Sequence, residues 1–188
     1  MEAKNYVFYK RVKRPLKFVF DKLYCPKYIG LENIPEKPYI LAGNHTSMLD
    51  IPLLISGIDD PINFMAKEEL FKNKAFAKIL EKMHAFPVKR GQRDMEAMRH
   101  ALVTLREGGV LGIFPEGTRN KSSELLEFQS GSEVLAKAAK APIVPFGIVG
   151  DYGFRSRVCL CIGEPLDPME VNKNPEMLRD KVKELIRR

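Results

Sequence analysis

The sequence lacks the long apolar run that a membrane-spanning helix requires. No stretch of roughly 18 uninterrupted apolar residues occurs in it. Its first residues, MEAKNYVFYKRVKRPLKFVFDKLY, also lack the continuous apolar core and the small-residue cleavage site of a signal peptide. We therefore expect a protein that neither crosses a bilayer nor is exported, and that works in the cytoplasm.

Cysteine and histidine are scarce, with three residues of each type. Cys25, Cys159 and Cys161 fit no metal-ligand spacing, and we interpret them as ordinary packing thiols. His84 and His100 have no nearby carboxylate at a useful spacing, so we interpret both as incidental. The sequence therefore gives no indication of a metal site, and only the third histidine calls for a chemical explanation.

Positive charge is abundant, and it is concentrated near the start of the chain. The formal net charge is +7, and residues 1–30 hold eight basic residues against two acidic ones. Such a surface favours anionic partners, which include phosphorylated substrates, acidic proteins, nucleic acid and anionic lipid. No basic helix-turn-helix, zinc finger or base-stacking pattern follows, so we expect no nucleic-acid partner.

Aromatic and aliphatic residues are interleaved with these bases at partly helical spacing. This pattern is typical of a helix that lies in a membrane interface, with its bases towards anionic lipid. We predict that residues 1–28 form an amphipathic membrane-docking segment, which Pro15 divides into two short helices. The alternative is a helix that docks on the protein itself, whose bases are only its solvated face.

From Pro38 onwards, apolar strand-like runs alternate with amphipathic helix-like runs. At 188 residues the chain suits one domain, and this alternation predicts an α/β domain over residues 29–188, with a mixed, largely parallel sheet flanked by helices. The predicted helix at 93–109 presents Met95, Met98, Leu102 and Leu105 on one apolar face. The predicted strands are 39–44, 62–67, 85–90, 110–114, 142–149 and 157–163. The other predicted helical segments are 50–57, 67–83, which could hold one helix or two, 130–141 and 174–188.

His45 follows the predicted strand at 39–44, and Asp50 begins the next predicted helix. A tight turn between them would bring the carboxylate to one imidazole nitrogen. That contact would fix the tautomer and leave the other nitrogen able to remove a proton. The same two residues could instead form a structural hydrogen bond that stabilises the turn.

Two further polar clusters follow strands and could bind an anion. PEGTRNKSS comes directly after the apolar run VLGIF, and AFPVKRGQRD contains a short strand followed by bases. Glycine permits close backbone approach, and a guanidinium binds phosphate through two parallel hydrogen bonds. Either cluster could equally be an exposed charged turn. The residues concerned are Glu116, Gly117, Thr118, Arg119 and Lys121 in the first cluster, and Lys89, Arg90 and Arg93 in the second.

Four stretches resemble the motifs of the glycerolipid acyltransferases. NHTSMLD resembles their first motif, N-H-x-S-x-x-D, and FPEGTRN resembles their third, F-P-E-G-T-R. AFPVKR and APIVPFGI resemble the second and fourth, and all four occur in the family's order over roughly residues 30–165. The sequence is most similar to the bacterial 1-acylglycerol-3-phosphate acyltransferases. It departs from the pattern at His84, where the second motif usually has glycine, and at Asn120, where the third usually continues with serine.

The resemblance implies a role for each of these residues. His45 is the general base that takes a proton from a glycerol hydroxyl as the hydroxyl attacks an acyl thioester, and Asp50 orients the imidazole. Arg90 and Arg119 hold the acceptor's phosphate with help from Lys67. The remaining residues that the resemblance assigns to substrate binding or to shaping the loop around it are Asn44, Ser47, Glu116, Gly117 and Thr118.

The resemblance also implies the partners. The donor is an acyl thioester of coenzyme A or of acidic acyl carrier protein, the acceptor is a lysophospholipid, and the product is phosphatidic acid. Because the donor arrives activated, no cofactor is needed, and the basic first segment would bind the inner face of the cell membrane. Glycerol-3-phosphate or another lysolipid is an alternative acceptor. A non-catalytic lipid-binding protein and a Ser-His-Asp hydrolase that uses Ser47 are the rivals, although no G-x-S-x-G motif is present.

Overall fold

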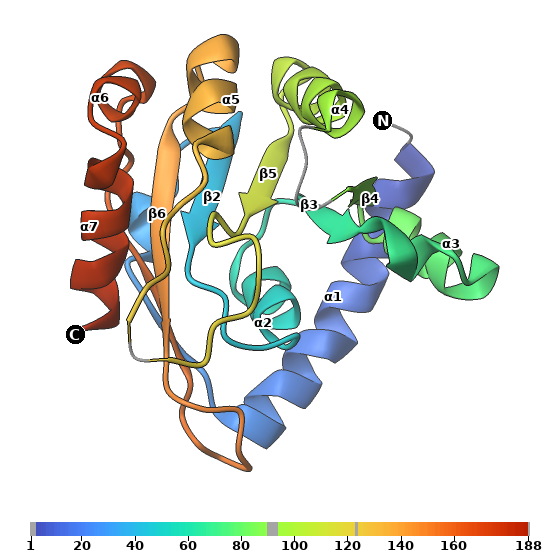
Figure 1. The fold of residues 1–188 in the computed structure, drawn as a ribbon. Coiled ribbons are helices and arrows are strands. Elements are labelled where there is room, and N and C mark those ends of the chain that lie inside the picture. The colour runs from blue at the N-terminus through green and yellow to red at the C-terminus, as the bar shows by residue number, and fades with distance from the viewer. Residues whose placement is uncertain (1–2, 90–93, 123, 188) are drawn as a thin grey trace.

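The computed structural model describes residues 3–89, 94–122 and 124–187, and its centre is a seven-stranded sheet (Figure 1). The strand order is β1-β7-β6-β2-β5-β3-β4, and every neighbouring pair is parallel except β6–β7. The predicted mixed, largely parallel sheet is therefore confirmed. The strands are β1 (Lys27–Ile29), β2 (Tyr39–Gly43), β3 (Ile62–Lys67), β4 (Ala85–Val88), β5 (Val110–Ile113), β6 (Ile143–Val149) and β7 (Cys159–Ile162).

Helices cover both faces of the sheet. Figure 1 shows α4, α5, α6 and α7 on one face and α1 and α2 on the other. The segment 67–83, predicted as one helix or two, forms two elements, a 3-10 helix at Glu68–Phe71 followed by α3. The short helix α6 and the short strand β1 were not predicted. The helices are α1 (Ala3–Tyr24), α2 (Asp50–Gly57), α3 (Lys74–Lys82), α4 (Met95–Arg106), α5 (Gly131–Ala139), α6 (Pro168–Lys173) and α7 (Glu176–Ile186).

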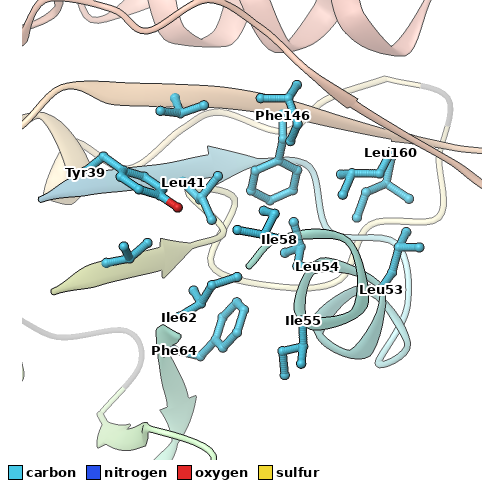
Figure 2. Packing of buried hydrophobic residues seen from close by; sticks show 14 of the residues in the cluster. Tyr39, Leu41, Leu53, Leu54, Ile55, Ile58, Ile62, Phe64, Phe146 and Leu160 are labelled. Atoms are coloured by element: carbon cyan, nitrogen blue, oxygen red, sulfur yellow. The ribbon is translucent and has the colours of Figure 1, made fainter. Parts of the chain in front are cut away.

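The core between α2 and the sheet fixes where the site-bearing loops leave the strands. Leu53 and Leu54 of α2 pack among side chains of the central strands, including Leu41 and Phe146 (Figure 2). Gly43, at the end of β2, has no room for a side chain because a Cβ atom there would collide with the carbonyl group of Phe146. The close approach of β2 to β6 therefore requires glycine at this position.

The predicted apolar face of α4 is partly wrong. Met95 is 73% exposed, whereas Ala97, Ala101 and Leu105 are buried against the sheet. The small alanine side chains allow α4 to lie close to the strands. Met95 begins the helix directly after its cap, Asp94, and lies outside that contact.

The prediction that Pro15 divides the first segment into two helices is wrong, because α1 runs through Pro15 as one helix. Proline removes one backbone hydrogen bond, but contacts on both sides of it hold α1 on the domain. Tyr9 and Phe20 are buried in the core. Between them, Lys13 Nζ donates to the carbonyl oxygen of Ile58 at 2.6 Å and lies 2.7 Å from Asp59 Oδ1. Tertiary packing therefore outweighs the local effect of the proline.

The opposite side of α1 remains exposed. Val7, Arg11, Arg14, Phe18 and Lys22 recur at intervals of three and four residues, which places them on one side of the helix, and all five are exposed. The Phe18 side chain is 64% exposed, whereas Phe20, two residues later on the other side of the helix, is only 3% exposed. Among the described helices, none is both long and apolar enough to cross a membrane.

The two phenylalanines of α1 provide a test of this packing. We expect Phe20→Ala to lower the free energy of unfolding by about 3–5 kcal/mol, because it leaves a cavity in the core. Phe18→Ala should change it by less than about 0.5 kcal/mol, because its ring is mostly in solvent. Urea denaturation of both variants measures the difference, and equal stabilities would contradict the placement of α1.

Candidate active site

The site lies at the carboxyl ends of β2 and β5, which are parallel neighbours with Ala42 opposite Ile113. The loops after these strands are therefore side by side, although the sequence separates them widely. They are also bonded to each other: the Asn120 backbone N–H donates to the His45 carbonyl oxygen at 2.7 Å, and Glu116 Oε1 accepts from the His45 N–H at 3.1 Å. This bonding fixes the backbone of His45 from both directions.

The turn after β2 brings His45 and Asp50 together, as the sequence predicts. Nδ1 of the imidazole lies 2.7 Å from Asp50 Oδ2, and both side chains are buried. A carboxylate accepts hydrogen bonds, so Nδ1 carries the proton and Nε2 is the nitrogen that accepts one. The arrangement has the geometry of a base with its orienting group.

The carboxylate of Asp50 is held by the turn that precedes α2. Oδ2 accepts from the backbone N–H groups of Thr46 at 2.7 Å and Ser47 at 2.8 Å, and Thr46 Oγ1 donates to Oδ1 at 3.3 Å. Asp50 is the first residue of α2, where the helix dipole also favours negative charge. These donors stabilise an anionic carboxylate without solvent contact.

Two aromatic residues complete the surroundings of the dyad, and the sequence reasoning missed both roles. Phe114 stacks on the imidazole with ring centroids 3.9 Å apart and an angle of 18° between the planes. The Tyr152 hydroxyl donates to Asp50 Oδ1 at 2.6 Å. Burial, and then the negative charge of Asp50, raise the pKa of Tyr152, so the phenol stays protonated and remains a donor. Phe114 opens the quoted motif FPEGTRN, whereas nothing in the pattern around Tyr152 signals its partner.

Glu116 holds loops together. Besides the His45 N–H, its carboxylate accepts from Asn120 Nδ2 at 2.9 Å and from the Leu126 N–H at 3.1 Å, and the residue is buried. Asn120, which departs from the family pattern, therefore takes part in the same network. The glycine that follows, Gly117, has a φ of +68°, which glycine adopts without strain.

Asn44 and Ser47 have backbone partners. Both polar atoms of the Asn44 side chain bond to the backbone of Ile148 on β6, at 2.9 Å and 2.7 Å. Ser47 Oγ accepts from the Leu49 N–H at 3.2 Å, within the turn. A serine nucleophile would instead donate its hydroxyl proton to the imidazole. The contacts of Ser47 therefore match a turn-stabilising residue.

Of the predicted phosphate-binding residues, Arg119 and Lys67 lie at the carboxyl end of the sheet. Arg119 and Thr118 are exposed in the loop after β5. Lys67 ends β3, which pairs with β5, and its Nζ lies 3.0 Å from Glu69 Oε1. Arg90, together with Arg93, lies outside the described residues.

Comparison with known proteins identifies the family. The sequence profile of the acyltransferase family matches residues 25–149, which include the dyad, Glu116 and Arg119. The chain belongs to the acyltransferase family. Tyr152 and all of α1 lie outside the range that this acyltransferase profile matches.

Individual acyltransferases are similar over most of the chain. The 1-acyl-sn-glycerol-3-phosphate acyltransferase of Bacillus subtilis is 33% identical, covering 94% of this chain and 96% of its own. A probable enzyme of the same name from Mycoplasma pneumoniae is also 33% identical, covering 81% of this chain and 64% of its own. The crystal structure of the 1-acyl-sn-glycerophosphate acyltransferase PlsC from Thermotoga maritima matches with a TM-score of 0.78 and 28% identity, over 98% of this chain and 81% of that one.

Proposed function

We propose that this protein transfers an acyl chain from an acyl thioester to the sn-2 hydroxyl of 1-acylglycerol-3-phosphate and so forms phosphatidic acid. The observation that carries this proposal is the buried His45–Asp50 dyad, in a chain 33% identical over almost its whole length to a 1-acyl-sn-glycerol-3-phosphate acyltransferase. The same chemistry with glycerol-3-phosphate or another lysolipid as acceptor is the alternative.

The geometry supports a general-base mechanism. His45 Nε2 takes the proton of the acceptor hydroxyl as its oxygen bonds to the thioester carbonyl carbon. Asp50 keeps the proton on Nδ1 and stabilises the imidazolium that forms. The carbon–sulfur bond then breaks, and the departing thiolate takes the proton from Nε2. No acyl-enzyme is required, because the acceptor itself is the nucleophile.

Acceptor recognition rests on positive charge at the carboxyl edge of the sheet. Arg119 follows β5 and Lys67 ends β3, so both lie near the end of the sheet that carries His45. We infer that these side chains, with Arg90, bind the acceptor's phosphate and align its hydroxyl on the imidazole. Gly117 and Thr118 shape the loop, and Glu116 holds it against His45.

The donor and the membrane are the other two partners. The donor is an acyl thioester of coenzyme A or of acyl carrier protein, and both carriers are anionic. Because the thioester is already activated, the transfer needs no further cofactor. The exposed side of α1 combines Val7 and Phe18 with Arg11, Arg14 and Lys22, a composition that favours an anionic lipid surface. We infer that this side of α1 holds the enzyme on the inner face of the cell membrane.

Replacing His45 tests the reaction and its base. We expect His45→Ala to lower acyl transfer by a factor on the order of 10² to 10⁴ while circular dichroism remains unchanged. His100→Ala, which removes an exposed histidine, should retain normal turnover. The assay measures thioester consumption with each donor, with and without lysophosphatidic acid, and resolves the lipid products. Near-normal turnover by His45→Ala, or free fatty acid formed without acceptor dependence, would contradict the mechanism.

Arg119→Ala tests phosphate recognition. Because the guanidinium pairs with the acceptor's phosphate, we expect the KM for lysophosphatidic acid to rise about tenfold or more, with a smaller change in the KM for the donor. Lys121→Ala removes an exposed positive charge from the same loop and is the matched control. An unchanged acceptor KM in Arg119→Ala, or an equal rise in Lys121→Ala, would count against this assignment.

Phe18→Ser tests membrane docking without disturbing the core. Because it removes an exposed aromatic ring from the proposed contact, we expect the apparent affinity for vesicles that contain phosphatidylglycerol, measured by co-sedimentation, to fall about tenfold. Met95→Ser changes a similarly exposed apolar side chain on α4 and should sediment as the wild type does. Equal sedimentation of the two variants would exclude this side of α1 as the docking surface.

A further inference from the structure

The two oxygens of the Asp50 carboxylate have different partners. Oδ2 contacts the imidazole and accepts from two backbone N–H groups, whereas Oδ1 accepts from the Tyr152 hydroxyl at 2.6 Å and from Thr46 Oγ1 at 3.3 Å. Asp50 is fully buried. Tyr152 supplies the shorter of the two bonds to Oδ1. If a buried carboxylate oxygen loses a donor, its desolvation is no longer compensated, so the side chain would rotate or shift to regain one.

The position of Tyr152 is set by α1, at the other end of the sequence. Its ring makes T-shaped contacts with Phe20 and Tyr24, at centroid distances of 6.4 Å and 5.7 Å. The backbone of the same loop is bonded to the last turn of α1, since the Arg157 N–H donates to the Tyr24 carbonyl oxygen at 3.0 Å. Figure 1 shows this loop beside the end of α1 that lies away from the N-terminus. The phenol is thus held by packing on one side and by Asp50 on the other.

We propose that Tyr152 is a positioning residue of the catalytic dyad, which orients Asp50 towards His45 and is itself held by α1. The hydroxyl fixes the rotation of the carboxylate so that Oδ2 faces imidazole Nδ1. A tyrosine from outside the matched family range therefore completes the site. The effect that we expect Tyr152 to have on kcat rests on the acyl transfer proposed above. The effect that we expect it to have on the orientation of the His45 ring does not.

Tyr152→Phe tests the hydroxyl alone, because it retains the ring that packs against α1. We expect kcat to fall about tenfold, while the KM values for donor and acceptor stay within about twofold, because the proposed role acts through Asp50 and not through substrate binding. Tyr28→Phe is the matched control, since Tyr28 is also half-buried but its hydroxyl pairs with Ser56 Oγ at 3.2 Å and not with Asp50. Its kcat should equal that of the wild type.

A double-mutant cycle separates positioning from general stability. If Tyr152 acts through the carboxylate, Tyr152→Phe should lower kcat in the wild type and have little further effect in Asp50→Asn. A merely structural role would lower kcat by the same factor in both backgrounds. Equal factors, or a normal kcat in Tyr152→Phe when the wild type is active, would overturn the proposal.

A spectroscopic measurement tests whether Tyr152 positions the dyad, and it does not depend on enzymatic activity. With nitrogen-15-labelled histidine, the ring resonances of His45, assigned by their loss in His45→Ala, should shift in Tyr152→Phe and stay in place in Tyr28→Phe. Unchanged resonances in Tyr152→Phe would overturn the proposal. A wild type that shows this shift but forms no phosphatidic acid would instead refute the proposed reaction and leave the positioning role standing.

Discussion

The buried carboxylate of Asp50 is the group on which the arrangement around His45 depends. It accepts from the imidazole of His45, from the turn that connects them and from Tyr152 of a distant loop. A charge with no solvent contact is tolerable only when its oxygens are supplied with donors. The turn after β2 and the β6–β7 loop therefore share a requirement, because each supplies donors to this one anion at the start of α2.

Parallel pairing explains why the motif residues meet. β2 and β5 lie side by side, so the loop that carries His45 and the loop that carries Glu116 leave the sheet at the same edge. The carboxylate of Glu116 accepts hydrogen bonds from backbone N–H groups and from a side-chain amide, and these bonds join the two loops. The acidic residue of the third motif thus holds the backbone of His45 in place, and the nearby Arg119 remains exposed at the same edge.

The sequence predicted the features that depend on residues close together in the chain. Hydrophobic runs located most strands and helices, and a spacing of five residues was enough to predict the contact between His45 and Asp50. It could not predict the continuity of α1 through Pro15, because burial of distant side chains outweighs the local preference of proline. Tyr152 was missed for the same reason, since its bond to Asp50 exists only once the β6–β7 loop returns to α1.

The contact between α1 and the β6–β7 loop also bears on biosynthesis. α1 is synthesised before the sheet, whereas Tyr152 and the backbone that bonds to its last turn are made much later. Domains fold as units during synthesis, and apolar surface that waits for its partner is prone to aggregation. The nascent chain therefore carries an incompletely covered amphipathic helix through most of translation, and a lipid surface or a chaperone near the ribosome would shield it until the loop arrives.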